Sequence, residues 1–71
     1  METVKHFEGL LADEQQNAAA LARCVREHAE AWREQPDALR TAAQSYGRAV
    51  GRVAELEAIV GGLRRRAQEV A

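Results

Sequence analysis

Residues 39–70 read LRTAAQSYGRAVGRVAELEAIVGGLRRRAQEV, and this stretch determines the architecture of the 71-residue chain. Apolar residues recur through it in alternating steps of three and four, without a polar interruption over five heptads. That spacing puts all of them on one side of an α-helix, which predicts a helix that packs lengthwise against another helix. These residues form the seam of the second half: Leu39, Ala42, Tyr46, Ala49, Val53, Leu56, Val60, Leu63, Ala67 and Val70.

The first half of the chain carries a fainter copy of the same pattern. Two polar residues, Glu14 and His28, interrupt it. We expect Glu14 to reach solvent or an arginine, and His28 to be partly buried. The apolar members of this first seam are Val4, Phe7, Leu11, Ala18, Leu21, Val25 and Trp32.

Pro36 is the strongest break in the helical pattern. Proline is tolerated in the first turn of a helix but costs roughly 3 kcal/mol in its interior. The sequence therefore predicts one domain over residues 1–71, with helix one at about 3–34, a turn at 34–36 and helix two at about 37–69. The expected fold is all-α: an antiparallel helical hairpin with coiled-coil-like packing.

A second architecture, one long kinked helix in a parallel coiled coil, stays open because the heptad phase continues through the proline. Charge favours the hairpin. Residues 1–37 hold eight acidic and four basic residues, whereas residues 38–71 hold three and six. Folding back at Pro36 brings opposite charges together: Glu8, Asp13 and Glu14 come near Arg64, Arg65 and Arg66.

A short extra N-terminal helix is also possible on the sequence. Gly9 is a poor helix former, and Asp13 followed by Gln16 resembles a capping box. Together they allow a bend near residue 12, between a short leading helix and the main one.

Size and composition limit the classes of function. A chain of 71 residues forms one small domain that is marginally stable unless disulfides, metals or oligomerisation help. We therefore expect a self-paired dimer or a bound protein partner. The net charge of −1 gives no support for nucleic-acid binding. The single cysteine fits a reducing compartment, and no apolar run is long enough for a membrane span or a signal peptide. A cytoplasmic protein is expected.

The back of the second helix, roughly opposite its seam, is rich in small residues. Glycine costs about 1 kcal/mol relative to alanine inside a helix, yet four of the five glycines lie here. Small side chains allow a second helix to approach closely, so this strip is a candidate docking surface; the alternative is compositional drift. The candidate partner-binding residues are Ala43, Gly47, Val50, Gly51, Ala54, Ala58, Gly61 and Gly62.

Catalytic and metal-binding patterns are weak. Cys24 and His28 share a helix face at the i, i+4 spacing that metal ligands use, but His6 is remote and a zinc site needs three or four ligands. Neither a nucleophile with its base, nor a phosphate-binding loop, nor a pair of catalytic carboxylates can be assembled. We expect no metal, no cofactor and no enzymatic activity.

The chain resembles the small E-type co-chaperones of bacterial type III secretion needle subunits, which are helical hairpins of similar length. The resemblance lies in residues 7–11 (FEGLL), 18–21 (AAAL) and 55–63 (ELEAIVGGL). It implies binding to a TPR-like chaperone and the needle subunit in the cytoplasm. Two further resemblances are weaker. Trp32 lies just before the turn, as in the secreted WXG-type hairpins, and residues 35–37 (QPD) resemble the proline-containing turn of the needle subunits themselves. A structural homo-oligomeric bundle is the remaining alternative.

Overall fold

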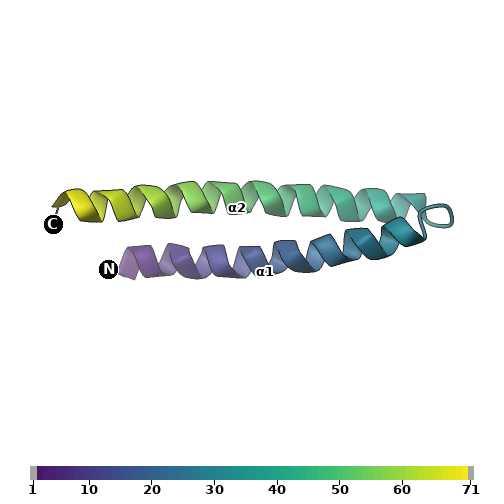
Figure 1. Ribbon diagram of the computed structural model, residues 1–71, viewed down its shortest axis with the longest axis horizontal. Helices are drawn as coiled ribbons and strands as arrows, with labels where there is room; N and C mark the ends of the chain where they lie inside the picture. Colours follow the sequence, from purple (N-terminus) through teal and green to yellow (C-terminus); the bar gives the residue numbers. More distant parts are fainter. Residues whose placement is uncertain (1, 71) are drawn as a thin grey trace.

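The fold is a hairpin of two long helices. The computed structural model describes residues 2–70, with the side chains of residues 3–69. Helix α1 spans Glu2–Glu30 and helix α2 spans Pro36–Val70; they run antiparallel and pack along their length (Figure 1). The hairpin measures 57 × 14 × 12 Å. The expected all-α antiparallel hairpin is confirmed, and the long kinked helix is wrong.

The turn is built around Pro36. The backbone N–H of Leu39 donates to the carbonyl of Gln35 at 3.3 Å, so Gln35 caps α2 and Pro36 is its first residue. Proline is favoured there because the first residue of a helix has no intrahelical use for its N–H. Asp37 follows in the first turn, where a carboxylate meets the positive end of the helix dipole.

Helix α1 ends at Glu30, four residues earlier than the sequence suggested. The N–H groups of Glu34 and Gln35 both donate to the carbonyl of Ala31 at 3.1 Å, which closes the chain reversal over residues 31–35. A residue before proline is disfavoured in helical conformation, so Gln35 has to leave the helix. Residues 31–34 are used in the reversal itself.

The extra N-terminal helix is absent from the described residues, because α1 runs without interruption from Glu2 to Glu30. Gly9 and Asp13 both lie inside it. A Cβ added at Gly9 would meet nothing within 4 Å, so this glycine makes no tight bend. Its cost of about 1 kcal/mol is small against the packing of Phe7 and Leu11 on either side of it.

The core follows the seam and is thin. Among the residues whose side chains are described, Ala49 and Val60 are the buried hydrophobic ones, at 0% and 3% exposure. The seam residues of α1 are half-buried from Val4 to His28, as the pattern predicted. Two expectations fail: Trp32 is 52% exposed because α1 has already ended, and Tyr46 is 37% exposed at the edge of the seam, while Ser45 beside it is half-buried.

Candidate protein-binding surfaces

An ion pair joins the two helices across the seam. Nε of Arg52 donates to Oε1 of Glu14 at 2.9 Å, and Nδ2 of Asn17 donates to Oε2 of the same carboxylate at 3.2 Å. The hydrogen bond from Arg52, followed by that from Asn17, holds the pKa of Glu14 below its usual value of 4.5. Glu14, one of the two polar residues that interrupt the first seam, is therefore paired with an arginine, as expected.

A second ion pair lies nearer the open end. Nη2 of Arg64 lies 3.1 Å from Oε2 of Glu8, and both side chains are largely exposed. The sequence predicted this pairing of an acid from the first half with the arginine run. Glu14 was grouped with the same run, but its partner is Arg52, which lies closer to the turn.

These two pairs identify the two sides of the seam. Glu8 and Arg64 each directly follow a seam residue, and they meet across the hairpin. Residues that follow seam residues therefore lie on one side of the hairpin, and residues that precede them lie on the other side. Arg52 belongs to the second set, since it directly precedes Val53.

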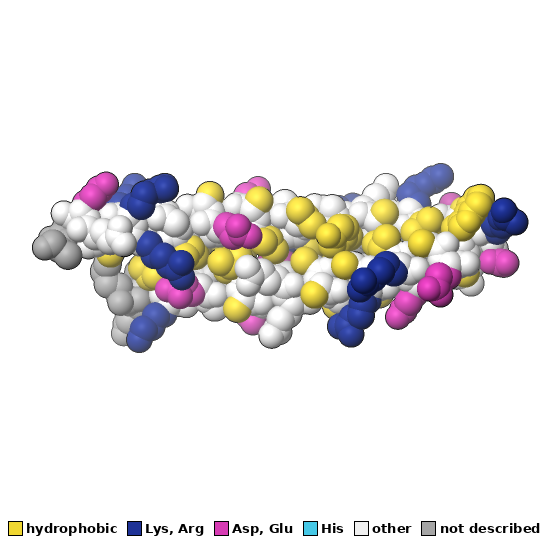
Figure 2. Space-filling view, viewed as in Figure 1, with side chains coloured by type: hydrophobic (Ala, Val, Ile, Leu, Met, Phe, Trp, Pro, Cys, Tyr) yellow, Lys and Arg dark blue, Asp and Glu magenta, His cyan; other side chains and the backbone are white. Residues whose placement is uncertain are grey.

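The first side, which we call the alanine face, is uncharged in its middle section. Glycine, alanine and valine predominate there, with one glutamine. Its middle residues are Ala12, Gln15, Ala19 and Ala22 of α1 and Gly47, Val50 and Ala54 of α2, with Tyr46 at its edge. The charged residues Arg26 and Glu57 lie on the same side and bound this section at its two ends. Hydrophobic side chains of both helices lie at the surface along the line where the helices meet (Figure 2). The sequence analysis missed this face, because which residues share a side depends on the helices being antiparallel.

The opposite side, which we call the arginine face, is polar over the same length. It carries the Glu14–Arg52 ion pair, and its large exposed hydrophobic side chains lie near the open end, where Leu10 and Ile59 are each 41% exposed. Its middle residues are Asp13, Asn17, Ala20 and Cys24 of α1 and Thr41, Ser45, Arg48, Arg52 and Glu55 of α2.

The candidate docking strip on α2 is open. Six of its residues are exposed, and Gly61 and Gly62 are half-buried. A Cβ added at any of the four glycines of α2 would meet nothing within 4 Å, so nothing within the hairpin requires a glycine there. Gly47, Val50 and Ala54 belong to both the strip and the alanine face. The other exposed strip residues are Ala43, Gly51 and Ala58.

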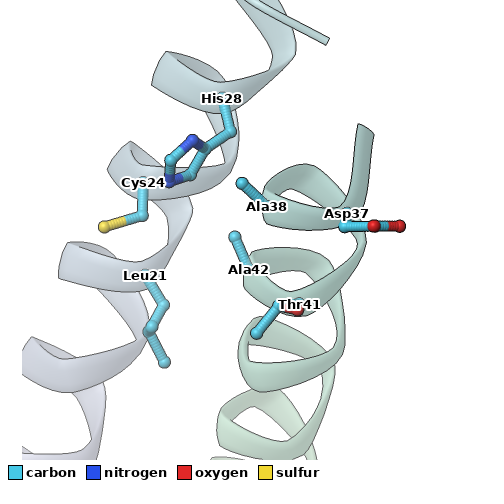
Figure 3. A pocket seen from close by; sticks show the side chains of 7 residues that line it. All are labelled: Leu21, Cys24, His28, Asp37, Ala38, Thr41 and Ala42. Carbon is cyan, nitrogen blue, oxygen red and sulfur yellow. The ribbon is translucent and has the colours of Figure 1, made fainter. Parts of the chain in front are cut away.

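A shallow hollow of about 460 Å³ lies beside the turn. Figure 3 shows the Cys24 side chain pointing away from α2 and the Asp37 carboxylate pointing away from α1. Cys24, His28 and Asp37 therefore do not converge on a common point. Within the described residues, no cluster of three His, Cys, Asp or Glu side chains could hold a metal ion. The hollow is lined by Leu21, Cys24, His28, Asp37, Ala38, Thr41 and Ala42.

Neither helix, over residues 2–70, has a stretch that is both long and apolar enough to cross a lipid bilayer. Comparison with known proteins found no match to the chain among protein-family models, curated proteins or solved structures.

Proposed function

We propose that this chain is a small non-enzymatic protein-binding module, which docks onto a helical partner through the small-residue strip of α2. The observation that carries the proposal is that the hairpin buries few of its hydrophobic side chains. Among the described side chains one alanine and one valine are buried, whereas five large hydrophobic side chains are 37–52% exposed. Chains this small need further burial to be stable, and a partner protein supplies it.

The strip suits such a partner. Alanine and glycine on a helix surface let another helix approach closely, and Val50, at 44% exposure, provides a larger apolar contact beside them. Glycine inside an exposed helix costs about 1 kcal/mol relative to alanine. The open space above all four glycines of α2 leaves that cost without compensation inside the hairpin.

The specific form that we propose is a cytoplasmic co-chaperone or adaptor of a secretion system. Its support is the resemblance to E-type co-chaperones, together with a hairpin of the kind that those proteins form. Such a role pairs the chain with a TPR-like chaperone and a needle subunit, which it keeps from polymerising. Co-expression with those two classes of protein and purification of the complex tests this form directly.

The docking surface is tested by Gly51→Leu, with Gly9→Leu as the matched control. Both glycines are exposed, and both have open space where a side chain would be added. Gly51 lies on the strip, whereas Gly9 lies on α1. Leucine is the better helix former, so each variant should keep or raise helicity by circular dichroism.

We expect Gly51→Leu to abolish capture of the partner by steric exclusion, while Gly9→Leu retains it. Equal capture by both variants would rule out the strip as the docking surface. Failure of the chain to capture any helical partner, with the hairpin intact, would rule out the protein-binding function itself.

A further inference from the structure

The hairpin exposes more surface than a compact protein of its size. Its accessible area is 5502 Å². Compact monomers of this mass expose about 4,400 Å² by the general scaling of area with mass, so the excess is about 1,100 Å². A standard protein interface buries about 800 Å² on each partner. The excess is therefore large enough to form one complete interface.

The alanine face is the side best suited to that interface. Its middle section has no charged residue on either helix, and Tyr46 and Val50 are exposed there at 37% and 44%. The arginine face carries four charged side chains over the same length. Burying those charges would cost several kcal/mol each unless every one of them were paired, whereas the alanine face carries no such cost.

Charge indicates what covers this face. Counting Asp, Glu, Lys and Arg, α1 has six acidic and three basic residues and α2 has four and six. One helix is therefore negative by three charges and the other positive by two. A second copy of the chain offers both helices at the right spacing, with the opposite charge available for each.

We propose that two copies pack through their alanine faces with both turns at the same end, forming a four-helix bundle. In this arrangement each α1 lies on α2 of the other copy, which pairs a negative helix with a positive one. Turns at opposite ends would instead put α1 on α1 and α2 on α2. Helices of like net charge would then be neighbours in the bundle.

The side-chain sizes fit the same arrangement. The Glu14–Arg52 and Glu8–Arg64 pairs bracket the alignment of the two helices. Midway between the alignments that the two pairs imply, Ala22 is about level with Tyr46, and Ala19 is about level with Val50. Packing with the turns together therefore places the large residues of α2 against small alanines of the other copy's α1. Large side chains against small ones at facing positions allow close packing.

The alanine face shares Gly47, Val50 and Ala54 with the docking strip, so a second copy and a helical partner would compete for these residues. The tests of the dimer use the isolated chain, so their outcome does not depend on the proposed function. The first test is sedimentation equilibrium of Val50→Arg, with Ile59→Arg as the matched control. Both side chains are exposed to a similar extent, at 44% and 41%, and they lie on opposite sides of the seam. Neither change should reduce helicity at high protein concentration.

We expect the wild-type chain to dimerise, Val50→Arg to weaken the dimer at least tenfold, and Ile59→Arg to leave it within twofold. A wild-type chain that stays monomeric across the micromolar range would overturn the proposal. So would a dimer that Ile59→Arg disrupts and Val50→Arg does not, since the interface would then be the arginine face.

The second test is the relative orientation of the copies. A spin label at Glu34→Cys in a Cys24→Ser background marks the turn, far from the alanine face. Turns at the same end predict a label-to-label distance well under half of the 57 Å length of the hairpin. A distance close to the full length would contradict the proposed pairing of α1 with α2.

Ionic strength gives an independent readout of the same pairing. Screening weakens attraction between opposite charges and weakens repulsion between like charges. The dissociation constant of the proposed dimer should therefore rise as salt is added. A dissociation constant that falls with salt would indicate that like-charged helices face each other, and would overturn the arrangement.

Discussion

The two sides of the seam belong to the same pair of helices but are stabilised in different ways. On the arginine face, Glu14, Arg52 and Asn17 satisfy one another within the chain. The alanine face has no equivalent polar network in its middle section, and its apolar side chains stay exposed. The polar groups of the arginine face are therefore paired within the chain, whereas the apolar side chains of the alanine face are those that the proposed dimer would cover.

The seam is common to both sides, so its loss should have the largest effect. Leu56→Ala removes packing at a half-buried seam position. We expect a loss of about 2 kcal/mol, the lower end of the range for leucine in a core, which is a large part of the stability of so small a hairpin. Urea denaturation followed by circular dichroism measures it. A midpoint equal to that of the wild type would mean that the seam is not the main source of stability.

Alanine in place of glycine compares the two sides directly. Gly47 lies on the alanine face and Gly62 precedes Leu63 on the arginine face; both have room for a methyl group. Each substitution should stabilise the isolated hairpin by about 1 kcal/mol through helix propensity. In the proposed dimer, Gly47→Ala should gain less than Gly62→Ala. Equal gains at every concentration would argue against a covered alanine face.

The Glu14 network makes the arginine face sensitive to acid. Because the folded-state pKa of Glu14 lies below 4.5, its contribution to stability is complete above that pH and is lost as the pH falls through the folded-state pKa. Thermal melts should show the wild type more stable than Glu14→Gln near neutral pH. The two melting temperatures should converge in acid, and a constant difference across this range would contradict the assignment.

The smallest effect is expected at the Glu8–Arg64 pair, the charged contact of the alanine side. Its side chains are 43% and 60% exposed. Exposed pairs contribute about 0.2–1 kcal/mol, and salt reduces the contribution. Glu8→Gln should therefore lower the free energy of unfolding only slightly, with the difference vanishing at high salt. A larger loss would show that this pair, like Glu14–Arg52, organises its side of the hairpin.

The sequence allowed most of the hairpin to be predicted, because heptad spacing and Pro36 depend on local geometry alone. Whether Tyr46 or Ser45 lies nearer the seam was harder to predict. An α-helix repeats every 3.6 residues rather than 3.5, so the buried position drifts along the helix and either residue can occupy it. The end of α1 was missed because residues 31–34 carry no glycine to mark it. The alanine face was missed because it is made by residues of both helices, and which of them share a side depends on the antiparallel arrangement.

The placement of the turn at one end of a 57 Å rod has a consequence for the order of folding. Every contact between α1 and α2 joins residues on opposite sides of the same short reversal, and closing that loop costs little entropy. Pairing can therefore start beside residues 31–35 and extend outward, one seam layer after another. The layers at the two free ends are then the last to pair and the first to open, and amide hydrogen exchange should show the weakest protection there.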